Sequence, residues 1–484
     1  MALLKRKIAN ITQESGLDNF APPGVDDSDP RVRGDSRACS VLYLVSCVLF
    51  YVLFFVSSSV CYTLAASHLP PLQAGSTFLL ITDLSGLGPT VEVSFYDDTG
   101  REVSTFHKLL PPDGKIQIKV EDYLRAAGSI VLESSNERIV GEYWQINKDR
   151  TMFMLPLQSP GEEGRYFVNC SWFPPCERNY IVLSDPYGTG PVVQMEFYSR
   201  MGELVKITRK LLRPYGTLVF EVSNSTSGDA LGKVSVRSFG GSVVLHYRQL
   251  CRNAEAQFSE PVTLAVPVYA PAKNLFVNEF STGRRITGNL TIADASAKGP
   301  VVRVQFLDFN GEVLANLEKL LPPNGIVNID PADYVSNVEN GIIKISSDSE
   351  IIANYWEQNP QTIVNIPAIP DILYKTSEIL SISYFLPAAV SKSNTQVSLS
   401  LLSVVQKTIE VELQFYNSEG KKIDSKEILL EPYERIRESV DHYFNQSRFG
   451  TIVVKGASLA VVLTSHVFDL KSGQSLGRAY AISR

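Results

Sequence analysis

One phrase occurs four times in this 484-residue chain and limits its fold more than any other feature. The copies begin at Phe95, Phe197, Phe306 and Phe415, at spacings of 102, 109 and 109 residues. They read FYDDTGREVSTFHKLLPPDG, FYSRMGELVKITRKLLRPYG, FLDFNGEVLANLEKLLPPNG and FYNSEGKKIDSKEILLEPYE. Units of this length can each bury a core, unlike the shorter units of a solenoid. We therefore expect tandem modules.

Every copy has the same parts in the same order. Apolar and polar residues alternate in segments 91–96, 192–198, 301–306 and 411–416, and a period of two is typical of a half-buried strand. A turn follows, and its glycine accepts the left-handed backbone that a hairpin needs. A second strand then runs to a leucine pair and ends at a proline. A fold needs these positions and a reaction does not, so the repeat predicts structure rather than chemistry.

Roughly seven short strands per copy, without helical periodicity, predict an all-β protein. We expect four tandem antiparallel β-sandwich domains over residues 72–161, 165–270, 272–369 and 371–484. Segments rich in proline, glycine and polar residues place the boundaries near residues 162, 271 and 370.

The order of these parts resembles the immunoglobulin-like or fibronectin-like repeats of secreted and surface-anchored bacterial proteins. It comprises a strand ending in Phe-Tyr, a turn with glycine, a Leu-x-Pro element, a strand that begins after glycine, and a last strand with tyrosine. The resemblance covers about residues 72–484. It implies the fold and an extracytoplasmic location, and it carries over no functional residue.

Residues 41–66 form an uncharged apolar run, and about 20 such residues cross a membrane as a helix. Arg31, Arg33 and Arg37 precede the run, so the positive-inside rule predicts a signal anchor with the repeats outside the cytoplasm. Residues 1–40 read as a disordered cytoplasmic tail. The alternative is a signal peptide cleaved near residues 63–65, which would release the repeats as a secreted protein.

The composition excludes some partners. The net charge is −6, from 45 basic and 51 acidic residues, so the chain lacks the excess of basic residues that binding to nucleic acid requires. The five histidines are scattered, and no metal-binding, nucleophile-elbow or phosphate-loop motif occurs. We therefore expect no catalytic residue, metal or cofactor. The expected partners are the membrane, through one helix, and an unidentified protein or glycan.

Three cysteines lie in the repeat region. Cys170 and Cys176 bracket a short proline-containing loop, and we expect them to form a disulfide outside the cytoplasm. Cys251 could instead pair with either of them.

The last strand of each copy supplies the candidate contact residues. Alternation places Ile139, Gly141 and Tyr143 in the core, and hence Trp144 on the opposite face. Trp356, Arg248 and His466 lie on the equivalent face of the other copies. We expect these four side chains either to bind a ligand, with the tryptophans as stacking platforms, or to pack on a neighbouring domain.

Two functions fit this sequence. The first is a non-catalytic, membrane-anchored envelope protein for adhesion, scaffolding, or binding of a partner or glycan. The second is an extracytoplasmic glycan hydrolase, because Glu142 and Glu357 lie beside aromatic residues. These two glutamates differ in register between copies, so we favour the first function.

Overall fold

The structure is a computed structural model in which most of the repeat region can be described. The described residues are 62–70, 75–147, 150–159, 165–170, 176–222, 231–251, 262–267, 270–359, 362–371, 379–386, 392–444, 447–456, 460–471 and 475–483. They lie within one compact unit, Cys61–Arg484. Their regular elements are β-strands and three short 3-10 turns, which confirms the all-β class. None of the described segments forms a helix with the length and hydropathy of a membrane span.

The strands fall into four repeats that follow the four copies of the sequence phrase. Repeat 1 comprises β1 (Tyr62–His68), β2 (Ser76–Asp83), β3 (Thr90–Asp97), β4 (Glu102–Leu109), β5 (Lys115–Lys119), β6 (Gly128–Ser134), β7 (Ile139–Ile146) and β8 (Met152–Pro156). Repeat 2 comprises β9 (Arg165–Asn169), β10 (Cys176–Ser184), β11 (Val192–Ser199), β12 (Leu204–Leu211), β13 (Thr217–Glu221), β14 (Leu231–Phe239), β15 (Val244–Cys251) and β16 (Val262–Pro267).

Repeats 3 and 4 follow the same order. Repeat 3 comprises β17 (Ala272–Phe280), β18 (Thr287–Asp294), β19 (Val301–Leu307), β20 (Val313–Leu320), β21 (Ile326–Ile329), β22 (Gly341–Asn359), β23 (Thr362–Pro367) and β24 (Ile369–Pro370). Repeat 4 comprises β25 (Ile379–Phe385), β26 (Thr395–Ser403), β27 (Ile409–Asn417), β28 (Lys422–Leu430), β29 (Arg435–Ser439), β30 (Phe449–Lys455), β31 (Val461–Asp469), β32 (Ser475–Tyr480) and β33 (Ile482–Ser483).

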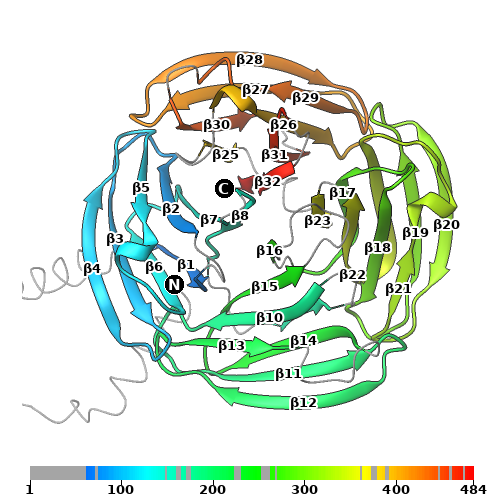
Figure 1. Ribbon diagram of the computed structural model, residues 1–484, viewed down its shortest axis with the longest axis horizontal. Helices are drawn as coiled ribbons and strands as arrows, with labels where there is room; N and C mark the ends of the chain where they lie inside the picture. Colours follow the sequence, from blue (N-terminus) through cyan, green and yellow to red (C-terminus); the bar gives the residue numbers. More distant parts are fainter. Residues whose placement is uncertain are drawn as a thin grey trace, which may run out of the picture. The chain divides into compact units, whose positions relative to one another are not determined.

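Each repeat folds into two sheets whose strands within the repeat pair antiparallel. In repeat 1 the outer sheet has the order β1-β6-β3-β4, and the inner sheet has the order β5-β2-β7-β8. The other repeats reproduce this order with two differences. The long strand β22 of repeat 3 serves both sheets, and the short strands β24 and β33 extend the outer sheets of repeats 3 and 4. Figure 1 shows β4, β12, β20 and β28 on the outside and β8, β16, β23 and β32 near the centre.

Alternating burial explains why these segments form sandwiches. On β3, the side chains of Val91, Val93 and Phe95 are fully buried in the core of repeat 1, between the two sheets. Equivalent positions fill the cores of repeats 2 and 3. The core of repeat 4 is larger, because it also takes in apolar side chains of repeats 1 and 3.

The beginning of the fold differs from the prediction. Strand β1 starts at Tyr62, ten residues before the predicted start of the first sandwich at residue 72, and it pairs with β6 along its whole length. Residues 62–66 are therefore strand and not the end of a membrane helix. The uncharged run misled the prediction because β1 is buried and needs no charged residue. The rest of the predicted span, residues 41–61, and the predicted tail, residues 1–40, lie outside the described residues.

The repeated phrase forms the contacts between repeats. Its hairpin turn lies against the proline turn of the following repeat, where a backbone carbonyl accepts a hydrogen bond from a backbone N–H. The four bonds are Thr217 N to Asp98 O (3.1 Å), Ile326 N to Arg200 O (2.9 Å), Arg435 N to Phe309 O (3.0 Å) and Lys115 N to Ser418 O (2.9 Å). The last bond joins repeat 4 to repeat 1, so the contacts close a ring of four repeats (Figure 1).

Glycine is required at this contact. Gly100, Gly202 and Gly420 have positive φ, and a Cβ on each would lie 1.8–1.9 Å from a proline carbonyl oxygen of the next repeat. The equivalent Cβ at Gly311 would lie 2.9 Å from the Pro432 oxygen. The turn glycines therefore serve close approach between repeats as well as the hairpin conformation.

The proline turn on the receiving side is held by a buried aspartate. In repeat 1 a hydrogen bond from Gly114 N to Pro111 O (2.8 Å) closes the turn, and Asp113 has a φ of +54°. Proline followed by a left-handed residue is typical of a type II turn. The carboxylate of Asp83 accepts the N–H groups of Gly88 (2.9 Å) and Asp113 (3.3 Å), so it ties the turn to the preceding loop. Asp294 does the same in repeat 3.

The ring has one further closure between repeats 4 and 1. Strand β32 pairs in parallel with β8, with Gly477 opposite Met152 and Arg478 opposite Phe153. This pairing joins the inner sheets of the two repeats into one eight-stranded sheet.

Candidate functional site

The two predicted tryptophans are buried between repeats. Trp144 on β7 is 1% exposed and packs in the core of repeat 4, where its ring lies 5.1 Å from the Phe385 ring. Its neighbour Tyr143 points into the core of repeat 1. The predicted alternation of this strand is therefore right. A stacking platform open to solvent is not formed, because repeat 4 covers the indole.

Trp356 is also 1% exposed, and it packs against Cys251 of repeat 2 and Ile363 of repeat 3. A hydrogen bond of 2.6 Å from Asn365 Nδ2 to Gln249 Oε1 links the same two repeats. Of the two alternatives for these tryptophans, packing on a neighbouring repeat is the arrangement found.

Arg248 on β15 lies in a buried polar cluster between repeats 1 and 2. Its guanidinium donates to the Leu69 carbonyl (2.8 Å), to Gln145 Oε1 (3.0 Å) and to His246 Nε2 (3.0 Å). It also lies over the ring of Phe153. Burial lowers the pKa of Arg248. Oxygen and nitrogen acceptors solvate this charge within the protein, as a buried polar group requires.

Two histidines of this cluster are held neutral. His68 Nδ1 lies 2.8 Å from the Tyr143 hydroxyl, and burial together with Arg248 lowers the pKa of His68 to about 3. Burial and the same guanidinium lower the pKa of His246 well below its ordinary value. The cluster therefore carries its positive charge on Arg248 at neutral pH.

His466 on β31 contributes to a second cluster, between repeats 3 and 4. Its Nε2 lies 2.5 Å from Ser475 Oγ, and its Nδ1 lies 3.7 Å from Glu279 of repeat 3. Glu279 also forms ion pairs with Arg437 (3.0 Å) and Arg478 (3.3 Å). Burial opposes ionisation of Glu279, but the adjacent cations hold its pKa well below its ordinary value. Burial and Arg478 lower the pKa of His466 to about 4.

A third buried cluster, between repeats 1 and 4, was not anticipated. Lys115 Nζ donates to Ser383 Oγ and to the Gly450 carbonyl (2.8 Å), and burial lowers the pKa of Lys115 to about 8. The two oxygens of Glu142 accept from Ser383 N (3.2 Å) and Trp144 Nε1 (2.8 Å). Glu142 is thus bound at an interface between repeats. Lys115 lies far from its partners in the sequence, so no local sequence pattern could predict this cluster.

Glu357, the other glutamate of the hydrolase hypothesis, is buried within repeat 3. It accepts from Ser281 N (3.0 Å) and from the Tyr355 hydroxyl (3.2 Å), and burial raises its pKa.

The cysteines differ from the predicted pairing. Cys170 is a free, buried thiol, and burial raises its pKa. The predicted Cys170–Cys176 disulfide is therefore wrong. Cys251 is disulfide-bonded, and the register of β10 and β15 places the backbone of Cys176 opposite it. The short loop made Cys170 and Cys176 the expected pair, whereas the strand register places the backbone of Cys176 opposite that of Cys251.

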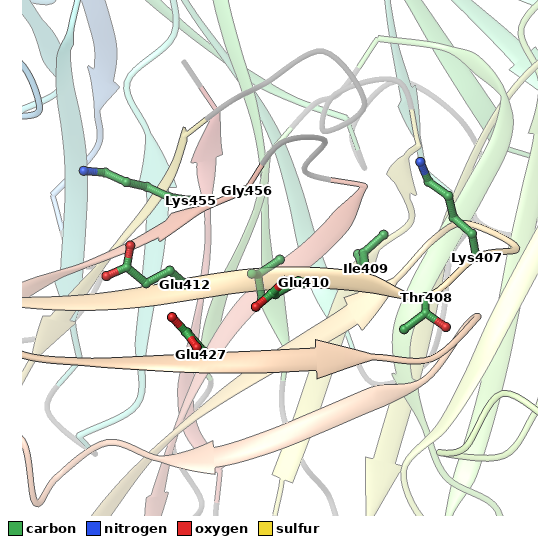
Figure 2. Close-up of a pocket in the computed structure, with 9 residues that line it drawn as sticks. Lys407, Thr408, Ile409, Glu410, Glu412, Glu427, Lys455 and Gly456 are labelled. Carbon is green, nitrogen blue, oxygen red and sulfur yellow. The ribbon is translucent and has the colours of Figure 1, made fainter.

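An open groove of about 450 Å³ lies on the outer sheet of repeat 4 (Figure 2). Glu412 on β27 lines the groove, and its backbone lies opposite that of Glu427 on β28 and Lys455 on β30, which also line it. Gln414 and Lys422 donate to the Glu412 carboxylate, and these bonds lower its pKa. The groove can accept hydrogen bonds from a polar ligand. Glu412 remains ionised near neutral pH, so it is poorly suited to donate a proton to a glycosidic oxygen.

One repeated signal escaped the sequence reading. Asp83 and Asp294 end the second strand of their repeats, and Asp185 directly follows that strand in repeat 2; each accepts backbone N–H groups from the following loop. Aligning DLSGLG, DPYGTG and DASAKG would have found them.

No protein-family model and no curated protein matches the chain. Solved structures give weak likenesses. Alpha-2-macroglobulin of Escherichia coli activated by porcine elastase has 8% identity and a TM-score of 0.15, over 87% of this chain and 43% of that one. The α-L-rhamnosidase of Streptomyces avermitilis complexed with L-rhamnose has 9% identity and a TM-score of 0.15, over 82% and 42%. A calcium-binding mutant of Bacteroides uniformis β-glucuronidase 2 has 12% identity and a TM-score of 0.10, over 45% and 28%. This chain thus spans less than half the length of each, and likenesses at this level carry no argument about function.

Proposed function

We propose that this chain is a non-catalytic, membrane-anchored extracytoplasmic protein whose repeats serve adhesion, scaffolding, or the binding of a protein or glycan partner. One observation carries the proposal. The phrase that the sequence repeats four times is used in four equivalent backbone contacts that close the ring. The turn residues that the four copies share thus maintain the arrangement of repeats.

Such a ring suits binding better than a flexible string of modules. The closing contacts and the buried clusters around Arg248, Glu279 and Lys115 fix each repeat against its neighbours. A surface held rigid before it meets a partner loses less conformational entropy on binding. The four outer sheets are then presented in a fixed arrangement.

The proposed location rests on the apolar segment of the sequence, on the burial of β1 and on the disulfide bond of Cys251. Residues 41–61 remain apolar, uncharged and long enough to cross a bilayer as a helix, after three arginines. Cleavage at residues 63–65 would cut within β1, whose Leu64 and Ala66 are buried in the core of repeat 1. This favours an anchor over a signal peptide cut there. The disulfide bond of Cys251 favours an oxidising compartment.

The finer fold belongs to the same proposal. We infer four immunoglobulin-like sandwich domains outside the membrane, following one transmembrane helix. Limited proteolysis of the full chain in detergent tests the division, and first cleavage between repeats, near residues 162, 271 and 370, supports it. First cleavage within the strands of a repeat would contradict it.

Topology and binding can be tested on cells that express the full chain. Protease added to intact cells should degrade the repeats and leave the leader, and protected repeats would refute the proposed topology. The same cells should retain a partner or glycan from the envelope without converting it. Retention that is absent with every envelope fraction tested would count against the binding function.

The groove of repeat 4 keeps a glycan hydrolase as the second candidate. Glu412 and Glu427 lie on adjacent strands of the groove, as a pair of carboxylates acting on one sugar bond would require. Release of sugar by the full chain, lost in both Glu412→Gln and Glu427→Gln, would establish this alternative in place of the first.

A further inference from the structure

Strand β12 is the edge strand of the outer sheet of repeat 2. It pairs only with β11 in the part of the chain that the structure describes, so one side of its backbone is unpaired. Seven of its eight residues are exposed, on both faces of the sheet. An unpaired strand edge of this kind is a template for a further strand.

The direction of the free groups follows from the register. Leu212 N donates to Pro191 O (2.9 Å), and Lys210, Thr208 and Lys206 lie opposite β11 residues at successive steps of two. In an antiparallel ladder these residues direct their N–H groups toward the partner strand. The N–H groups of the intervening residues, Ile207, Arg209 and Leu211, therefore point away from the sheet.

The side chains of β12 set it apart from the other three outer edges. β12 carries Lys206, Arg209 and Lys210 and no acidic residue. Each of the other edges, β4, β20 and β28, combines acidic and basic residues. The four equivalent edge strands thus differ in charge, and β12 carries basic residues on both faces.

Apolar and further basic groups continue this surface. Leu204, Val205 and Ile207 are each about half exposed, and Leu211 is 72% exposed. Arg209 donates to Gln194 on β11 (2.7 Å), and the Gln194 backbone lies opposite Arg237 on β14. Arg165 and Arg237 flank the single carboxylate of Glu196 at 3.9 and 3.8 Å. This region therefore keeps an excess of positive charge.

We propose that β12 is a docking edge for an acidic, extended peptide segment of a partner protein, which adds to the outer sheet of repeat 2 as a further strand. The free N–H and C=O groups match the backbone of a peptide, whereas a polysaccharide or a lipid surface has no such regular ladder. The basic side chains of β12 pair with acidic residues of the peptide. The exposed apolar side chains of β12 contact the peptide residues between them. This inference rests on the proposed binding function and names the surface and the class of partner.

The test uses the full chain in detergent and a fluorescent peptide of about ten residues that alternates valine and glutamate. We expect saturable binding that weakens with salt. We also expect that N-methylation of alternate peptide amides removes it, and that a valine–lysine peptide does not bind. An N-methylated or lysine peptide that binds equally well would overturn the proposal.

Two pairs of variants locate the site. Lys206→Glu combined with Lys210→Glu should weaken binding roughly tenfold or more, because it reverses two charges on one face. Lys319→Glu, at the position of β20 equivalent to Lys210, should leave binding unchanged. Ile207→Pro removes an outward N–H and should abolish binding, whereas the equivalent Asn316→Pro in β20 should not.

The remaining outcomes also decide the question. If the Lys206 and Lys210 variant only promotes self-association and leaves peptide affinity unchanged, these lysines merely protect the edge, and the proposal fails. If heparin or phosphatidylglycerol vesicles bind at this strand and the peptide does not, the partner is a polyanion or a membrane. If Ile207→Pro does not fold, the peptide and charge variants still decide. Partner retention by cells that survives loss of peptide binding would leave the proposed function standing without this site.

Discussion

Replacing Gly420 by alanine should open the contact between repeats 4 and 1. Gly420 has a φ of +83°, and an added Cβ would lie 1.8 Å from the Pro112 oxygen. A carbon and an oxygen in contact are about 3.3–3.6 Å apart, so the two turns must separate by about 1.5 Å. A hydrogen bond of 2.9 Å between Lys115 N and Ser418 O cannot stretch that far.

The expected cost has two parts. Left-handed alanine costs about 1–2 kcal/mol, and the lost hydrogen bond costs about 1 kcal/mol more. Gly240 provides a matched control, because its φ is +80° and an added Cβ meets nothing within 4 Å. We therefore expect Gly240→Ala to lower the free energy of unfolding by about 1–2 kcal/mol and Gly420→Ala by about 2–3 kcal/mol. Gly311→Ala should fall between them, since its Cβ would lie 2.9 Å from Pro432 O.

Urea unfolding of the full chain in detergent measures these free energies. Amide hydrogen exchange of Lys115 reports on the contact itself, and Thr217, the equivalent donor between repeats 1 and 2, serves as an internal reference. In Gly420→Ala the Lys115 amide should lose protection while the Thr217 amide keeps it. Unchanged protection at Lys115, or equal destabilisation by Gly240→Ala and Gly420→Ala, would refute this account of the ring.

Three further outcomes follow from the buried groups. Trp144→Ala should lower the free energy of unfolding by about 3–5 kcal/mol in urea, because it leaves a cavity between repeats 1 and 4, and an effect under about 1 kcal/mol would contradict this packing. Cys170 should react with iodoacetamide only after unfolding, as mass spectrometry of native and urea-treated protein would show; rapid labelling of native protein would count against its burial. His68, with its pKa lowered to about 3, stays neutral in the folded state while the unfolded state gains a proton near pH 6.5, so its contribution to stability is present above pH 6.5 and is lost as the pH falls toward 3. His68→Gln should therefore reduce the acid-dependent loss of stability by up to about 1.4 kcal/mol per pH unit between pH 6 and 4, and equal slopes for the two proteins would show that His68 is not the group responsible.

Alternation along each strand was enough to predict the fold class and the faces of the strands. Val93 and Phe95 are buried as their period of two predicts, and Tyr143 and Trp144 point to opposite sides. This period reports only which residues share a face. It does not report what covers that face, so the sequence left open whether Trp144 meets solvent, a ligand or another repeat.

Contacts between repeats were harder to predict, because their partners lie far apart in the chain. Lys115 and Ser383 belong to different repeats, and Glu279 meets Arg478 across an interface. In their own segments, Lys115, Glu279 and Arg478 look like ordinary surface charges. Arg248 and His466 were candidates because they lie on the face of the last strand that carries tryptophan in the other two copies. Their contact partners belong to other repeats and could be identified only from the structure of the ring.

The parallel pairing of β32 with β8 has a consequence for how the chain matures. During synthesis or export, the first three repeats are complete long before repeat 4 is available to cover Trp144 and the free edge of β8. Until then the nascent protein exposes the Trp144 indole and the unpaired edge of β8. An exposed strand edge can pair with a neighbouring chain. The last strands to emerge therefore close the ring. A polypeptide that ends before β32 should be prone to degradation or to strand pairing with a second molecule.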